Sequence, residues 1–268
     1  MIKAAFSLKE LPFTKEISTA NLFMHPQFKE FTARLSMLCE NRGIGLFTGE
    51  VGCGKSTAVR TILESLSPRT HRVVYLYRGL DNVGAFYTQI ASELGIMPRF
   101  RKTDVAAQVL SHIAELYTQQ KITAVLVIDE AHLLKPEIFD EIRLLHNSRF
   151  DSCDYLATAL VGQPPLKKMI AYTKYLPLKQ RISVSCHLAP LDKEQGYEFF
   201  NHQLSVVNAS QKIFLDNAVE TIVCASKGVP RLINTIASKA MSHAAINKKC
   251  SIVDQEIVME VLDELGLK

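Results

Sequence analysis

Features that would assign this sequence to several common classes of protein are missing from it. Residues 1–15 contain no apolar core of the kind found in signal peptides, and no uninterrupted apolar run is long enough to cross a bilayer. None of the 6 cysteines lies in a CxxC pair, so neither a zinc site nor a thioredoxin-type motif is predicted. We therefore expect a protein of the reducing cytoplasm that is not inserted in a membrane.

Internal repeats, low-complexity linkers and a strong charge bias are also lacking. The 268 residues are 47% hydrophobic and 22% charged, which is typical of a globular protein with a large core. This length favours one large domain and one small domain. The net charge of +4 is compatible with a nucleic-acid partner, but a dedicated DNA-binding domain is usually more basic.

The first 190 residues alternate between helical and strand patterns. We expect helices at 25–41, 54–66, 83–94, 103–120 and 136–147, and strands at 44–47, 73–77, 124–128, 156–161 and 182–188. The 124–128 segment is apolar throughout, as in a central parallel strand that is covered on both faces. Strands that alternate with helices predict an α/β fold with a parallel sheet.

The pattern changes after Pro190, because every later segment is helical in its spacing. These segments are 192–207, 211–226, 230–247 and 254–264, with Asp192 and Asp254 as N-caps of the first and last. We therefore predict an α/β domain over residues 1–190 and an all-helical domain over 191–268. Within the first, residues 1–43 would form an N-terminal segment and a helix that lead into the 44–47 strand.

A phosphate-binding motif follows the 44–47 strand and precedes a helix. The pattern G-x-x-x-x-G-K-[ST] is matched by Gly49, Glu50, Val51, Gly52, Cys53, Gly54, Lys55 and Ser56, with Thr57 next. Glycines let backbone N–H groups turn toward phosphates, and the N-terminus of the following helix favours an anion. In this motif Lys55 reaches the β- and γ-phosphates and the Ser56 hydroxyl binds Mg²⁺. The sequence therefore predicts that these residues bind ATP.

Asp129 and Glu130 directly follow the 124–128 strand. Ligands of open α/β sheets bind at the carboxyl ends of strands, so we expect this strand to lie beside the 44–47 strand. Asp129 would hold Mg²⁺ through the metal's water shell, and Glu130 would orient and deprotonate the attacking water. The alternative is an acidic N-cap for the helix near residue 135. For His132 we favour a structural role over a contact with the site.

Five segments together resemble the ExeA/GspA-like AAA+ ATPases, a group similar to the TnsC, TniB and MuB transposition ATPases. The segments are 49–56, 127–132, 160–164, 180–182 and 228–234, and the resemblance covers nearly the whole chain. The phosphate-binding motif and the acidic motif are shared by all P-loop ATPases of this kind. The Gly-Gln-Pro and Gly-x-Pro-Arg elements are more specific to this group. The resemblance implies a P-loop AAA+ domain, with a central parallel sheet flanked by helices, followed by an all-helical lid domain.

The resemblance also implies catalytic roles for three further residues. Gln163 would be sensor 1 and Arg231 would be sensor 2, which contacts the γ-phosphate. Arg181 would be an arginine finger that acts on ATP held by a neighbouring subunit, and a guanidinium suits phosphate oxygens. For Arg231 the alternative is a structural salt bridge, and for Gln163 it is an ordinary loop hydrogen bond. Lys179 and Arg143 compete with Arg181 for the finger role.

The densest basic stretch, residues 98–103, interleaves an aromatic residue with basic ones. The resemblance to TnsC-like filaments implies that this stretch contacts the backbone of double-stranded DNA through Arg99, Arg101, Lys102 and Thr103. Such contacts depend on salt and carry little sequence selectivity. The alternative is a solvated charged loop. No helix-turn-helix or zinc finger is evident in the sequence, so any DNA binding would be weakly sequence-selective.

Three functions remain open. In the first, ATP-bound subunits assemble head to tail on DNA as a ring or helical filament, recruit a transposase and disassemble on hydrolysis. The second is a cytoplasmic ATPase of an ExeA-type secretion system, whose longer members add a membrane span and a peptidoglycan-binding region. Because this sequence stops at Lys268 without either, we favour transposition. The third is a general AAA+ loader or chaperone.

Overall fold

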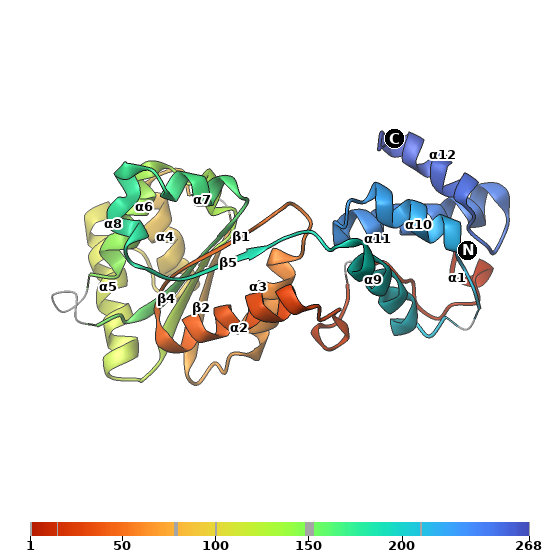
Figure 1. Ribbon diagram of the computed structural model, residues 1–268. Coiled ribbons are helices and arrows are strands. Elements are labelled where there is room, and N and C mark those ends of the chain that lie inside the picture. The colour runs from red at the N-terminus through yellow and green to blue at the C-terminus, as the bar shows by residue number, and fades with distance from the viewer. Residues whose placement is uncertain are drawn as a thin grey trace. The chain divides into compact units, whose positions relative to one another are not determined.

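The computed structural model describes residues 2–14, 16–77, 80–99, 101–147, 153–209 and 211–267. They form two compact units, which we call the α/β unit and the helical unit (Figure 1). The α/β unit comprises Pro26–Glu50 and Lys55–Leu188. The helical unit comprises Met1–His25, Val51–Gly54 and Ala189–Lys268.

A five-stranded parallel sheet forms the centre of the α/β unit. Its strands are β1 (Gly43–Gly49), β2 (His71–Leu76), β3 (Thr123–Ile128), β4 (Leu156–Gly162) and β5 (Ile182–Leu188). They lie in the order β2-β3-β4-β1-β5. Every residue of β1, β3 and β4 is buried, which agrees with their apolar sequences, whereas the edge strand β5 alternates between buried and exposed residues.

One expectation about the sheet is wrong, because β3 does not lie beside β1. Strand β4 lies between them and pairs with both. All three strands are parallel, so their carboxyl ends still reach the same edge of the sheet. The residues that follow β4 therefore lie at the same edge, between those that follow β1 and β3.

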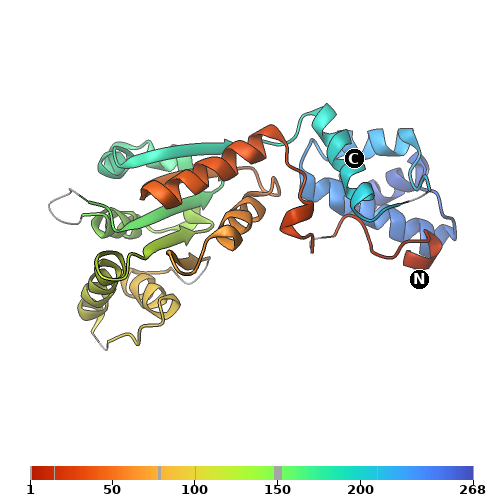
Figure 2. The same cartoon turned by 90° about the horizontal axis from the view of Figure 1, so that it is seen from below.

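Helices cover both faces of the sheet. Helices α2 (Pro26–Asn41) and α3 (Lys55–Ser65) pack together on one face (Figure 2). There the ring of Phe31 in α2 lies 5.1 Å from that of Phe47 in β1. The other face packs against α4 (Val83–Glu93), α5 (Lys102–Thr118), α6 (Pro136–Leu145), α7 (Pro165–Ile170) and α8 (Leu176–Lys179). Short 3-10 helices occur at Ala131–Leu133 (η2) and Thr173–Tyr175 (η4). The predicted alternation of strands and helices is confirmed.

The helical unit contains α1 (Ile2–Ala5), η1 (Thr19–Asn21), α9 (Lys193–Val206), α10 (Asp216–Ala225), α11 (Pro230–His243), η5 (Ala244–Lys248) and α12 (Gln255–Leu265). Asp192 and Asp254 cap α9 and α12 through their side chains, as predicted. Helix α10 begins later than expected. Residues 213–215 are extended because Phe214 pairs with Val253 in a parallel bridge.

The N-terminal residues pack into the helical unit, so the division differs from the expected 1–190 and 191–268. The ring of Phe13 lies 4.9 Å from that of Phe200 and 5.9 Å from that of Phe214. Phe6 and Leu8 are buried in the same core. These apolar side chains fill the space between the helices. Burial of their surface stabilises the contact although they are far from these helices in the sequence.

The Gly-x-Pro-Arg turn provides a test of this packing. Gly228 has a φ of +72°, its carbonyl oxygen accepts a hydrogen bond from Leu191 N, and a Cβ there would lie 1.8 Å from Leu191 O. We expect Gly228→Ala to lower the free energy of unfolding by more than about 3 kcal/mol, as measured by urea titration.

Gly266→Ala is the matched control, because Gly266 has a φ of +64° with no atom within 4 Å of the added Cβ. It carries the backbone strain without the clash and should cost about 1 kcal/mol. Equal losses in the two variants would show that the Leu191 contact contributes nothing.

Candidate nucleotide site

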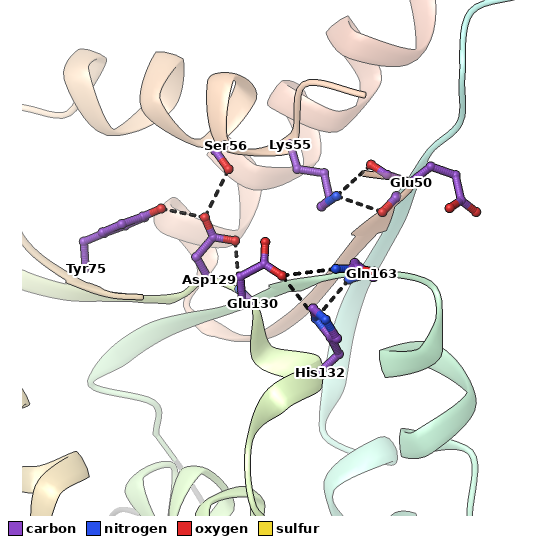
Figure 3. A network of polar contacts seen from close by, with 9 residues as sticks. Glu50, Lys55, Ser56, Tyr75, Asp129, Glu130, His132 and Gln163 are labelled. Carbon is purple, nitrogen blue, oxygen red and sulfur yellow. Dashed lines mark hydrogen bonds and ion pairs between the residues drawn. The ribbon is translucent and has the colours of Figure 1, made fainter. Parts of the chain in front are cut away.

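The phosphate-binding loop connects the end of β1 to the start of α3. Gly52 and Gly54 have φ values of +83° and +100°, which a side chain rarely permits. The buried Lys55 ammonium donates hydrogen bonds of 2.8 Å to the carbonyl oxygens of Gly49 and Glu50 (Figure 3). The N-terminus of α3 and a lysine ammonium thus meet at the carboxyl end of β1. This arrangement suits a phosphate anion.

The Asp129 carboxylate accepts hydrogen bonds at both of its oxygens. Oδ2 accepts from the Ser56 hydroxyl at 3.1 Å and from the Tyr75 hydroxyl at 2.6 Å (Figure 3). Oδ1 accepts from the backbone N–H of Glu130 at 2.8 Å. The predicted Mg²⁺ ligands Ser56 and Asp129 therefore lie together although they are 73 residues apart. A hydroxyl and a carboxylate are hard oxygen donors, so the pair fits Mg²⁺.

The side chains of Glu130, His132 and Gln163 meet beside the Asp129 carboxylate. Glu130 Oε2 lies 3.4 Å from Gln163 Nε2 and 3.5 Å from His132 Nδ1. The backbone N–H of Gln163 donates to the same His132 nitrogen at 3.4 Å. Gln163 follows β4, so the inserted strand carries it to the acidic pair. His132, for which we expected a structural role, contacts both Glu130 and Gln163 (Figure 3).

Glu130 has a left-handed backbone, with φ of 52° and ψ of 34°. A side chain in this region costs about 1 kcal/mol or more. The turn directs the Glu130 N–H to the Asp129 carboxylate and the Glu130 side chain toward Gln163. The two carboxylates therefore face different partners. The N-cap alternative does not describe Glu130, because the N-cap of the helix near residue 135, α6, is Lys135. The Glu130 side chain makes no capping hydrogen bond to η2 either.

Tyr75 is the site residue that the sequence did not reveal. It lies one residue before the end of β2, and it has the alternating pattern of an ordinary strand residue. Burial, followed by the hydrogen bond to Asp129, raises the pKa of the Tyr75 hydroxyl above its usual value, so it stays protonated. A polar side chain near the carboxyl end of a strand was the available signal, but tyrosine is common in strands.

Arg231 contacts the phosphate-binding loop through its backbone. Its N–H donates to the carbonyl oxygen of Gly52 at 3.2 Å. Pro230 occupies the first turn of α11 and has no N–H, so Arg231 supplies one of the first amide donors of that helix. A Cβ on Gly52 would lie 2.9 Å from Arg231 Cβ. The glycine is therefore needed at this approach. The role of the Arg231 side chain as sensor 2 stays a prediction.

The remaining candidates lie on other elements. Arg181 immediately precedes β5 and is partly buried, and its action on a neighbouring subunit stays a prediction. Arg99 and Arg101 are exposed before α5. Phe100 and the side chains of Lys102 and Thr103 lie outside the described residues. The DNA assignment of this stretch therefore also stays a prediction.

A parallel sheet with this strand order, a phosphate loop after β1 and an acidic pair after β3 define the AAA+ class of P-loop ATPase fold. Residues 38–170 match the family described as an AAA domain. The fold is similar to that of Cdc6p from Pyrobaculum aerophilum, with a TM-score of 0.75 at 18% identity over 94% of this chain and 70% of that one. The ORC1 protein of Aeropyrum pernix, solved in complex with DNA, gives 0.72 at 13% identity over 94% and 68%. The RuvB branch migration motor of Thermotoga maritima gives 0.55 at 18% identity over 90% and 70%.

Two curated proteins are similar in sequence. General secretion pathway protein A of Aeromonas hydrophila is 29% identical over 98% of this chain. A helix-turn-helix-type transcriptional regulator of Methanocaldococcus jannaschii is 23% identical over 77% of it. The matches span 48% of each relative's length, about half. These comparisons show that the chain has a P-loop AAA+ fold and that its sequence is similar to those of these two proteins.

Across the described ranges, no helix has both the length and the apolar character needed to cross a membrane.

Lys55→Ala tests the phosphate site. Removal of the ammonium eliminates charge-assisted hydrogen bonds to phosphate, so we expect ATP affinity to fall by roughly 100-fold or more in a fluorescence titration. Lys29→Ala removes an exposed lysine of α2 and serves as the control. Wild-type affinity in Lys55→Ala would contradict the assignment of this loop to phosphate binding.

Proposed function

We propose that the chain hydrolyses ATP to ADP and phosphate with Mg²⁺ as cofactor. The observation that supports this most directly is the contact of Ser56 with Asp129, with Glu130 and Gln163 beside it. The bound Mg²⁺ would neutralise charge on the phosphate oxygens. Ser56 and Asp129 would hold it, the latter through water, and residues 49–57 would hold the nucleotide.

Each remaining side chain has a proposed task. Lys55 binds the β- and γ-phosphates. Glu130 accepts a proton from the attacking water, for which its half-exposed carboxylate is accessible. Gln163 orients that water or the γ-phosphate. Its hydrogen bond to Glu130 supports this task, because it places the two side chains close enough to contact the same water. Arg231 is proposed as sensor 2, since its backbone already lies against Gly52.

Glu130→Gln should separate binding from hydrolysis. The amide keeps the shape of the side chain but accepts no proton, so the ATPase rate should fall by about 10²–10⁴-fold while ATP affinity is retained. Glu137→Gln, which neutralises an exposed acid of α6 outside the site, is the control. A normal turnover rate in Glu130→Gln would remove this residue as the water activator.

We further propose that ATP controls assembly of this protein on double-stranded DNA during transposition, where it recruits a transposase. The sequence resemblance to TnsC-type ATPases supports this process, and the similar folds include a protein solved with DNA and a branch migration motor. ATP-bound subunits would form a ring or helical filament, and hydrolysis would time disassembly. The candidates for phosphate contacts are the exposed Arg99 and Arg101, together with Lys102 and Thr103, whose side chains lie outside the described residues. The DNA-bound protein would act in the cytoplasm.

A secretion ATPase is the second candidate. It is favoured by the 29% identity to general secretion pathway protein A over 98% of this chain. That candidate predicts ATP turnover that is indifferent to DNA.

Electron microscopy with duplex DNA and a non-hydrolysable ATP analogue separates the two. DNA-coated rings or filaments that need the analogue, and that weaken steeply as salt rises, would support the transposition role. Bare protein on the grid, together with an ATPase rate unchanged by DNA, would eliminate it and leave the secretion role. Glu130→Gln with ATP should give the same assemblies as the analogue.

Arg181→Ala tests whether the ATP site is completed by a neighbouring subunit. An arginine supplied in trans contributes about 10³–10⁵-fold to turnover in related phosphoryl transfers, so a large loss is expected. Mixing Arg181→Ala with Lys55→Ala should restore activity, because each subunit then supplies the part that the other lacks. Lys179→Ala is the control for the neighbouring basic residue. Mixtures as inactive as the separate variants would leave Arg181 without a role in trans.

A further inference from the structure

The Tyr75 hydroxyl occupies a position that none of the nucleotide motifs explains. It donates a hydrogen bond of 2.6 Å to Asp129 Oδ2, the oxygen that also accepts from Ser56. Strand β2 lies at one edge of the sheet and pairs in parallel with β3, with Tyr75 opposite Val127. The tyrosine therefore approaches the acidic pair from the side opposite β4, which carries Gln163.

The three donors to Asp129 act on different parts of its carboxylate. Ser56 and Tyr75 share Oδ2, and the N–H of Glu130 holds Oδ1. A carboxylate with donors on both oxygens cannot rotate freely about its Cβ–Cγ bond without losing at least one of them. Hydrogen bonds of this kind around metal-binding carboxylates set both orientation and affinity.

We propose that Tyr75 is a positioning residue that orients the Asp129 carboxylate for Mg²⁺. When the nucleotide binds, the Ser56 hydroxyl would bind the metal and no longer donate to Asp129. The Tyr75 hydroxyl would then remain as the side-chain donor to Oδ2. Tyr75 therefore contributes to metal binding without contact with the metal or the phosphates. This inference rests on the proposed function, because it concerns the Mg²⁺ side of the same ATP site.

The competing explanation is that Tyr75 makes an ordinary packing hydrogen bond. The α/β unit offers a matched case, since the Tyr87 hydroxyl donates to Glu141 Oε2 at 2.8 Å. The pKa of each tyrosine is raised, first by burial and then by the hydrogen bond to its carboxylate. Both bonds thus join a protonated hydroxyl to a carboxylate, but Glu141 carries no predicted nucleotide role. Tyr87→Phe is consequently the control for the loss of such a bond.

The experiment measures binding of a fluorescent, non-hydrolysable ATP analogue as Mg²⁺ is added, which does not depend on turnover. We expect Tyr75→Phe to raise the Mg²⁺ concentration at half-maximal enhancement by about 10-fold. Affinity in excess EDTA should stay at the wild-type value, because Lys55 and the loop are unchanged. Tyr87→Phe should leave both quantities at wild-type values even if it lowers the melting temperature.

A double-mutant cycle guards the result against a general loss of structure. In an Asp129→Asn background, Tyr75→Phe should produce no further shift in the Mg²⁺ midpoint, since the carboxylate that it orients is gone. The inference is overturned if Tyr75→Phe binds Mg²⁺ like the wild type, or if Tyr87→Phe shifts the midpoint equally. If instead the wild-type protein shows no Mg²⁺-dependent nucleotide binding, the proposed function itself fails.

Discussion

Parallel pairing of β3, β4 and β1 brings the carboxyl ends of three strands to one edge of the sheet, and the contacts of the candidate site depend on it. β1 delivers the phosphate loop, β3 delivers Asp129 and Glu130, and β4 delivers Gln163. The strands are buried throughout, so a shift in their register would expose apolar side chains. The same hydrophobic constraint that forms the sheet therefore holds polar groups from distant parts of the chain within hydrogen-bonding distance.

Within that edge the two acidic residues are held in different ways. Asp129 is 9% exposed and accepts hydrogen bonds of 2.6, 2.8 and 3.1 Å from three donors. The Glu130 side chain is 44% exposed, and its polar contacts with other described side chains are long, at 3.4 and 3.5 Å. Long, exposed contacts are weak, so Glu130 can change partners at small cost. A fixed carboxylate beside a movable one suits the proposed site, in which Asp129 would hold the metal and Glu130 would accept a proton.

The helical unit depends on apolar packing in a similar way. Aromatic rings from the N-terminal segment and from α9 fill one core, and Gly228 lets the chain pass close to Leu191. The turn that follows presents the Arg231 N–H to Gly52. Gly52 belongs to the phosphate loop, so one role of the Gly-x-Pro-Arg element is structural: it supplies a backbone hydrogen bond to that loop. This hydrogen bond does not depend on the charge of the Arg231 side chain.

The amino-acid sequence was enough to predict the α/β class, the five strands of the sheet, every described helix of ten or more residues and the meeting of Ser56 with Asp129. The elements and the phosphate motif follow from local rules, since hydrophobic periodicity and a contiguous eight-residue motif need no knowledge of distant residues. The meeting of Ser56 with Asp129 follows from the general rule that ligands of parallel sheets bind at the carboxyl ends of the strands. Three features were decided only by tertiary structure: the insertion of β4 between β1 and β3, the packing of Phe13 against Phe200, and the contact of Tyr75 with Asp129. Strand order and cross-element contacts depend on which buried surfaces fit together over the whole chain. A tyrosine in a strand has the same local pattern whether or not a carboxylate lies at the end of the next strand.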